Sequence, residues 1–258
     1  MLILPKNSKS NNRINGKLFE EAFSIVAAGK YSSKNPYMKE AKIAFKKSKK
    51  YLVSSKIVKR TGNKVKACNG DILIKNQSIE IKRVSSGRGT YLNASLSALE
   101  KYGAPAFYGQ KSREYLSKFY GQEVYDKYSP LTHEQSKDFR HNHANEYKEL
   151  TALDKEERKD YVTTVYNYFV NNPDICKQFF SDILNKNISN KKAPDVMIVY
   201  NYKKNSTEVL TKDNILSFNG ENKLKKTDLG LSYGNIRVQF GWQNGNGCNN
   251  PTLRAFLD

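Results

Sequence analysis

The chain has 258 residues, with 44 Lys and Arg against 25 Asp and Glu, a formal net charge of +19 and an isoelectric point near 9.6. A hydrophobic fraction of 38% and an aromatic fraction of 12% exclude a disordered basic tail. The sequence contains no apolar run of about 18 residues, hence no membrane span, and its three cysteines lack metal or disulfide spacing, which indicates a reducing, cytoplasmic compartment.

The positive charge is concentrated in the first quarter of the chain. Residues 1–66 hold 17 Lys and Arg against three acids, a net charge of +14, whereas residues 114–160 hold eight against 11, a net charge of −3. A basic surface that served only solubility would not be segregated in this way. The asymmetry favours nucleic acid as the partner of the first quarter. For a single run such as KKSKK at 46–50, a solvated helix face is the alternative.

The first part of the chain predicts two helices followed by strands. Residues 15–29 repeat apolar side chains with helical period, with Asn15 as the expected N-cap. Residues 36–50 predict a second, strongly basic helix. The segments YLVSSKIVKR, DILIK and SIEIKRV then have the composition of β-strands, and the short polar break Asn76-Gln77 predicts a hairpin between the last two.

The rest of the chain predicts helices and then strands again. Helical period is found in residues 92–102, 111–128 and 145–185. Strand character is found in residues 194–202, 207–211, 235–242 and 252–258, the first of which is continuously apolar and of the buried type.

This pattern predicts an α/β (α+β) fold in which a mixed β-sheet is flanked by helices. We expect residues 1–258 to form a single domain, because no linker divides them clearly. Residues 105–180 are then a mostly helical insertion, and residues 231–258 are a C-terminal β segment.

The residues with the clearest chemical meaning lie in the expected hairpin. Glu80 and Lys82 are two apart on a strand, so their side chains leave the same face. Asp71 begins the neighbouring strand and comes beside that face if the hairpin closes. Two carboxylates and a lysine would then converge in an apolar sheet, where charges are costly unless they are paired or bound to metal.

This set of residues suits metal-assisted hydrolysis of a phosphodiester. Asp71, Glu80 and the Ile81 carbonyl would supply hard oxygen ligands for Mg²⁺. Lys82 would orient the attacking water or offset the charge that grows on the scissile phosphate. The alternative is a surface hairpin with cross-strand Glu–Lys pairing, because a D…ExK pattern arises by chance in many basic proteins.

Other polar residues are candidates for contact with DNA. The loop after the catalytic strand contains glycines, small hydroxyls and an arginine, which suit close approach to phosphates or a guanine edge. A glycine loop that caps the following helix, and polar side chains on a solvated strand, are the alternatives. The candidates are Ser85, Ser86, Arg88, Thr90, Arg237, Gln239, Asn244, Asn246 and Arg254.

Three stretches of the chain carry a family resemblance. They are GKLFEE at 16–21, GDILI…IEIKRVSSGRGTYLNASL at 70–96, and LSYGNIRVQFGWQNGNG with LRAFLD at 231–247 and 253–258. In this order they resemble the PD-(D/E)xK nucleases, and within them the restriction endonucleases related to MspI and to its HinP-named relative. Residues 181–200 are a weaker fourth match, and residues 105–180 match poorly.

The resemblance adds two residues to the candidate site. It implies that Glu20, on the N-terminal helix, lies near the metals and that Asn93 reads a base in the major groove. Where these relatives have an amide, this chain has Glu80, the glutamate of the wider superfamily, which should strengthen metal binding.

The resemblance also implies an activity. It implies Mg²⁺-dependent cleavage of duplex DNA at a short palindromic site with CG at its centre, by a monomer or a homodimer, with the C-terminal β segment near the bases. A cognate DNA methyltransferase would be the functional partner. Two alternatives remain open, a non-catalytic protein that binds nucleic acid through a basic β-ribbon and a structure-specific or repair endonuclease.

Overall fold

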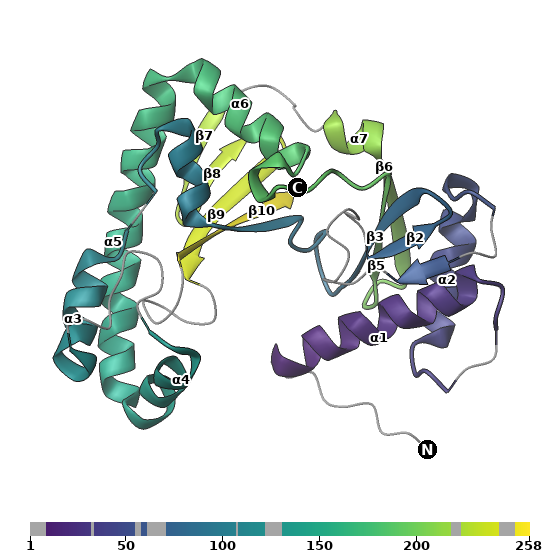
Figure 1. The fold of residues 1–258 in the computed structure, drawn as a ribbon, viewed down its shortest axis with the longest axis horizontal. Coiled ribbons are helices and arrows are strands. Elements are labelled where there is room, and N and C mark those ends of the chain that lie inside the picture. The colour runs from purple at the N-terminus through teal and green to yellow at the C-terminus, as the bar shows by residue number, and fades with distance from the viewer. Residues whose placement is uncertain are drawn as a thin grey trace. The chain divides into compact units, whose positions relative to one another are not determined.

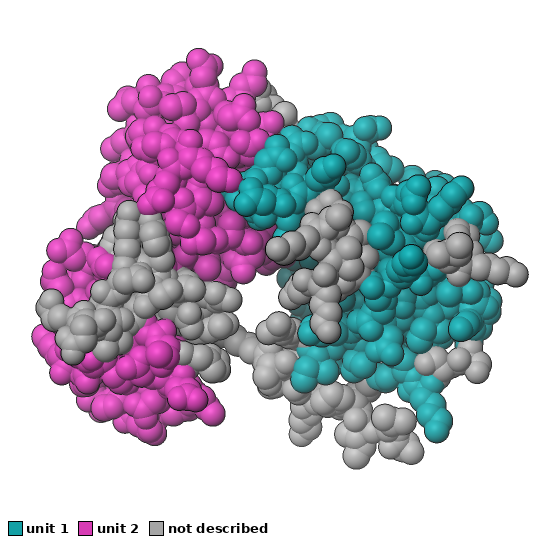
Figure 2. Space-filling model, in the orientation of Figure 1, with its two compact units in different colours: residues 1–89, 184–217 teal, residues 90–183, 218–258 magenta. Residues whose placement is uncertain are grey.

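The chain divides into two compact units. The computed structural model describes residues 9–31, 34–54, 58–60, 71–106, 108–121, 131–217, 223–242 and 251–258. Unit 1 comprises Met1–Gly89 and Leu184–Ser217, and unit 2 comprises Thr90–Ile183 and Phe218–Asp258 (Figure 2). The expected helical insertion and the C-terminal β segment therefore both belong to unit 2, whereas the expected catalytic hairpin belongs to unit 1.

Unit 1 is built on a five-stranded mixed sheet (Figure 1). Its strand order is β1-β2-β3-β5-β6; β3 and β5 run parallel and the other neighbours run antiparallel. The strands are β1 (Val58–Arg60), β2 (Ile72–Ile74), β3 (Gln77–Val84), β5 (Val196–Asn201) and β6 (Ser206–Thr211). The helices are α1 (Lys9–Ala27), α2 (Met38–Ser48) and α7 (Lys212–Leu216), with the 3-10 turns η1 (Lys49–Tyr51) and η5 (Asn187–Ser189).

Helix α1 covers one face of this sheet with an apolar stripe. Phe19, Phe23 and Val26 are buried at helical spacing, and they share one core with Ile79 and Ile81 of β3. Each buried side chain of this size stabilises the fold by about 2 kcal/mol. The stripe therefore fixes which face of β3 points into the core, and with it the face on which the polar residues of β3 emerge.

Unit 2 is built on a second five-stranded sheet, which is antiparallel throughout. Its strand order is β4-β10-β9-β8-β7. The strands are β4 (Leu92–Ser95), β7 (Leu224–Thr227), β8 (Gly230–Tyr233), β9 (Ile236–Trp242) and β10 (Pro251–Leu257). The helices are η3 (Leu96–Tyr102), α3 (Gln110–Tyr120), α4 (His133–Asn142), α5 (Ala144–Asn171) and α6 (Pro173–Leu184).

The α+β class and the mixed sheet predicted from the sequence are confirmed, with a second, antiparallel sheet in addition. The described residues within 105–180 are mostly helical, as predicted. None of the helices in the described part of the chain is long and apolar enough to cross a membrane.

Two boundaries near the candidate site differ from the prediction. Helix α1 begins at Lys9, so Asn15 lies inside the helix and is buried instead of capping it. Residues 92–102 form β4 and then a 3-10 helix instead of one α-helix, because β4 pairs with β10 and the Ser95 side chain caps η3.

Two other differences lie in unit 2. The expected helix 145–185 is two helices. Helix α5 ends at Asn171, and α6 begins at Pro173, a residue that lacks the backbone N–H needed to continue α5. The expected helix 111–128 is α3, which ends at Tyr120; residues 122–130 lie outside the described part of the chain. Strand β7 was not predicted, because its short run of Leu, Lys and Thr carries little apolar alternation, whereas all but the first residue of β8 lies in the expected β segment 231–258.

Candidate active site

The hairpin β2–β3 sets the geometry of the site. Ile72 pairs with Ile79 and Ile74 with Gln77, so the connecting turn is Lys75-Asn76, one residue earlier than predicted. Lys75 adopts a left-handed backbone, with a φ of 57°, which a two-residue hairpin turn requires. The turn therefore fixes the register of the two strands that carry the candidate catalytic residues.

The side chains of Glu80 and Lys82 emerge together on one face of β3, as the alternation predicts. Ile79 and Ile81 enter the core on the face packed against α1, which leaves residues 80 and 82 on the opposite face. The Lys82 Nζ lies 2.7 Å from the Glu80 Oε1, an ion pair within hydrogen-bond distance. Glu80 is 4% exposed and the Lys82 side chain is 27% exposed, so the carboxylate of this pair sits largely out of water.

Asp71 lies beside the same strand, as predicted. It directly precedes β2, and its Oδ2 accepts a hydrogen bond of 2.8 Å from the backbone N–H of Ile81. The N–H and the C=O of one residue leave an extended strand on the same edge. The Ile81 carbonyl oxygen therefore faces the edge of β3 at which Asp71 lies.

A second lysine, Lys186, completes the surroundings of Glu80. Its Nζ forms an ion pair and hydrogen bond with the Glu80 Oε2, and its side chain is 7% exposed. Each oxygen of the Glu80 carboxylate is thus bound by a different ammonium group. Lys186 was not among the residues predicted for the site, because it is separated from Glu80 by 106 residues and lies in a short segment without periodicity.

Burial and neighbouring charges act in opposite directions on these groups. Burial raises the pKa of Asp71, although Lys82 partly offsets it. Burial acts in the same direction on Glu80, but Lys82 and Lys186 outweigh it and hold the pKa of that carboxyl below its usual value. Burial acts to lower the pKa of Lys82, but the charges of Glu80 and Asp71 outweigh this effect and raise the pKa above its usual value. Glu80 and Lys82 are therefore both charged near neutral pH.

Glu20 on α1 is within electrostatic reach of the site. Burial, followed by the charge of Asp71, raises its pKa to about 7, whereas Lys82 and Arg60 act to lower it. The structure therefore brings Glu20 into the same charged cluster as the hairpin residues. Its carboxyl group changes protonation near neutral pH, unlike that of Glu80.

The oxygen donors of the site suit a hard cation. Asp71 and Glu80 contribute two carboxylates, and the Ile81 carbonyl faces the same edge of the strand. Mg²⁺ is usually held by one or two carboxylates, keeping several waters or taking phosphate oxygens. Among the described residues, no group of three or more His, Cys, Asp or Glu side chains is spaced to hold a metal. The residues therefore fit a Mg²⁺ site that water or a phosphate completes, not a closed protein cage.

The loop after β3 places its arginine against an acid. Arg88 forms a two-pronged ion pair with Glu208 of β6, at 2.9 and 2.6 Å. Ser86 is exposed, whereas Ser85 and Thr90 are partly buried. To bind a phosphate, Arg88 would have to exchange Glu208 for it. Contact between Arg88 and DNA stays a prediction.

Three of the predicted DNA-reading residues form a row across the sheet of unit 2. Arg254 of β10 pairs with Asn93 of β4 on one side and with Gln239 of β9 on the other. Residues directly opposite each other on antiparallel strands share a face. The opposite face is apolar; Phe240, for example, packs edge-on against Tyr161 of α5. The row therefore lies on the face turned away from this helix.

Arg237 lies two residues before Gln239 and so shares the face of this row. Its guanidinium is bound by the carboxylate of Asp258 at 2.6 and 2.9 Å and lies over the ring of Phe256. Arg254 donates to the Trp242 carbonyl at 2.9 Å. Asn244 and Asn246, also predicted to contact DNA, lie outside the described residues.

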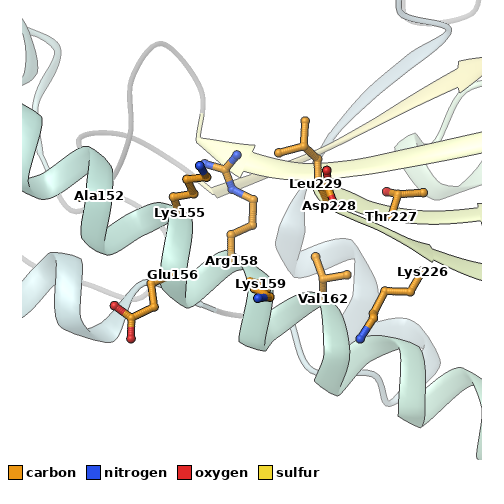
Figure 3. Close-up of a pocket in the computed structure, with 10 residues that line it drawn as sticks. All are labelled: Ala152, Lys155, Glu156, Arg158, Lys159, Val162, Lys226, Thr227, Asp228 and Leu229. Atoms are coloured by element: carbon orange, nitrogen blue, oxygen red, sulfur yellow. The ribbon is translucent and has the colours of Figure 1, made fainter.

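Unit 2 also contains a groove with a volume of about 610 Å³ between α5 and the β7–β8 turn (Figure 3). Apolar and charged side chains both line it, and Lys155, Lys159 and Lys226 supply most of its positive charge. All three lysines are exposed. The guanidinium of Arg158 is instead anchored by the buried carboxylate of Asp154. The exposed lysines can therefore attract an anion, although Lys226 also donates a hydrogen bond of 3.3 Å to the Thr163 hydroxyl.

No protein-family model matches the chain, and no curated protein matches it. What the site can do follows from its own residues. Two carboxylates and a backbone carbonyl can hold a cation, and Lys82 beside them can stabilise negative charge.

Proposed function

We propose that this protein is a Mg²⁺-dependent type II restriction endonuclease that cleaves duplex DNA at a short palindromic site in the cytoplasm. The observation that carries the proposal is the convergence of Asp71, Glu80 and Lys82 on one hairpin, inside a unit whose first 66 residues have a net charge of +14. Charges buried in an apolar sheet are costly, which argues for a chemical role.

Asp71 and Glu80 would hold the cation, with the Ile81 carbonyl as a third donor. A bound Mg²⁺ supplies Lewis-acid stabilisation of the phosphoryl oxygens when DNA is present. The hydrogen bond from the Ile81 N–H fixes one oxygen of Asp71 and so orients the carboxylate toward the site. This orientation is set before substrate arrives, which reduces the reorganisation needed in the transition state.

Lys82 would act as a fixed cation and hydrogen-bond donor. Because Glu80 and Asp71 raise its pKa, the ammonium keeps its protons at neutral pH and is unsuited to act as the base. It would orient the attacking water and offset the charge that grows on the scissile phosphate. Glu20, with a pKa raised to about 7, is better placed to accept a proton near neutral pH.

Sequence readout would come from the row on the sheet of unit 2. Asn93, Arg254 and Gln239 carry amide and guanidinium groups of the kind that read adenine and guanine edges. Their arrangement across three paired strands gives them fixed spacing, which a flexible loop would not. The lysines of the first 66 residues would bind phosphates without reading sequence.

A plasmid digest tests this function. With Mg²⁺, the proposal expects discrete fragments on each plasmid of known sequence, with sizes that map to one common short site. No cleavage is expected when EDTA removes the metal. A random smear would contradict site specificity. Preferential cleavage of junctions or mismatches would indicate the structure-specific alternative, and salt-sensitive binding of uncut DNA would indicate a non-catalytic protein.

A further inference from the structure

The ammonium group of Lys186 is buried at the candidate site and has no part in the mechanism proposed for Asp71, Glu80 and Lys82. Its side chain is 7% exposed, and it forms an ion pair with the Glu80 Oε2. Lys82 binds the other oxygen of the same carboxylate, at 2.7 Å. One carboxylate is thus shared by two ammonium groups, and water screens the nearly buried pair of Glu80 and Lys186 only weakly.

The backbone around Lys186 fixes the position of this side chain. Lys186 has a φ of 59°, in the left-handed region that few non-glycine residues adopt. Its carbonyl oxygen accepts hydrogen bonds from the N–H groups of Ser189 and Lys191 and from the Ser189 hydroxyl, each at 3.1 Å. A strained residue held by several bonds is found where the direction of a side chain matters. Here that direction is toward Glu80.

The contacts of Glu80 have a consequence for any cation that it binds. A divalent cation would take a carboxylate oxygen that an ammonium already binds, and it would be repelled by the remaining positive charge. Repulsion between a divalent cation and a buried ammonium a few ångströms away is strong, because the surroundings screen it weakly. Lys186 is therefore placed to oppose binding of the cation as well as to orient its ligand.

We propose that Lys186 is a positioning residue that competes with the divalent cation for Glu80. Its ammonium holds the carboxylate in place and keeps the affinity of the DNA-free protein for the cation low. Negative charge from a DNA phosphate offsets this repulsion, so the cation binds tightly only together with DNA. This inference rests on the proposed function, since it takes Glu80 as a ligand of the cation.

Binding of Mn²⁺ to the DNA-free protein tests the competition. The signal of free Mn²⁺ in electron paramagnetic resonance gives the dissociation constant without any cleavage reaction. We expect K186M to bind Mn²⁺ at least tenfold more tightly than the wild type, and K186R, which keeps the charge, to remain within about threefold of it. K191M is the matched control, because Lys191 is an exposed lysine of the same segment, and it should change the affinity less than twofold.

Two more variants keep the test decisive. K186N removes the charge with a residue that tolerates the left-handed backbone, so it reports even if K186M does not fold. In an E80Q background, K186M should tighten Mn²⁺ binding less than it does in the wild type, because the carboxylate for which the ammonium and the cation compete is gone and only their mutual repulsion remains.

The outcomes separate this inference from the proposed function. Unchanged or weaker Mn²⁺ binding by K186M and K186N, with clear binding by the wild type, overturns the role of Lys186 and leaves the metal site standing. Absence of Mn²⁺ binding in the wild type and all variants, in the presence of DNA as well as without it, overturns both.

Discussion

Two regions of this molecule gather positive charge, and they do so in different ways. At the candidate active site in unit 1, Lys82 and Lys186 each bind one oxygen of the buried Glu80 carboxylate. In the groove of unit 2, Lys155 and Lys159 are exposed on the surface of α5. The active site holds two ammonium groups that are paired with one buried carboxylate. The groove holds ammonium groups that are exposed to solvent.

The difference shows how burial changes what a charge can do. At 4 Å, two unit charges interact by about 1 kcal/mol in water but by about 4 kcal/mol near a protein surface, and by more in its interior. Salt largely screens the interaction between exposed charges that lie more than about 8 to 10 Å apart. Buried charges therefore suit chemistry at one atom, whereas exposed lysines suit general attraction to a polyanion. Variants in each region test whether the buried charges act in catalysis and the exposed lysines in DNA binding.

Removal of a buried carboxylate should have the largest effect. D71N removes a candidate cation ligand but keeps the shape of the side chain, so the rate of DNA cleavage should fall by about 100- to 1000-fold. DNA binding should change little, because most of the positive charge lies elsewhere. Single-turnover cleavage and a binding isotherm measure the two effects. D228N, in the exposed turn of the groove, is the control and should cleave like the wild type.

Replacement of Lys82 should come next. K82M leaves Glu80 with Lys186 as a partner but removes the ammonium proposed to face the phosphate, so kcat should fall by about 100-fold. The dissociation constant for DNA should change less than threefold. K159M, in the groove, should show the reverse, with weaker binding and an unchanged kcat. Equal losses of kcat in the two variants would remove the distinction between the regions.

Glu20 should affect stability in a pH-dependent way. A carboxyl whose pKa rises from 4.5 to about 7 on folding binds more protons in the folded than in the unfolded state, so it destabilises the protein as pH rises through this interval. E20Q should therefore be more stable than the wild type at pH 8, by about 1 to 2 kcal/mol after allowance for solvent screening. The difference should vanish below pH 4.5. Urea unfolding at both pH values measures it, and a difference independent of pH would be contrary to the account.

The smallest effect is expected in the groove. K155E/K159E should weaken DNA binding only a few-fold at low salt, and the slope of log K against log salt should fall by about one for each phosphate that the protein no longer neutralises. The cleavage pattern and the rate at saturating DNA should stay the same. A change of fragment pattern would show that the groove reads sequence instead of attracting the backbone.

The chemistry of the hairpin was predictable because it is local in sequence. Alternation on β3 determines that Glu80 and Lys82 share a face, and a two-residue turn brings Asp71 beside them. The apolar stripe of α1 and the buried strand β5 were visible for the same reason. Each of these features depends on residues within one helix, one strand or one turn.

What the sequence did not predict depends on contacts between distant residues. Lys186 meets Glu80 across 106 positions, and only the arrangement of its turn directs it there. The helical period of residues 92–102 was overridden by pairing of β4 with β10, another distant contact. Arg88 was predicted to face DNA, but the acid that binds it, Glu208, is on a strand that follows it by more than 100 residues.

The most direct test of the central claim is to sequence the ends of genomic DNA digested with Mg²⁺ by the wild type and by D71N side by side. The account predicts that wild-type ends collapse onto one short palindrome with a constant cut position, and that D71N produces few ends above background. Ends scattered without a common sequence would contradict a restriction endonuclease. Equal cleavage by D71N would contradict the catalytic role of the hairpin itself.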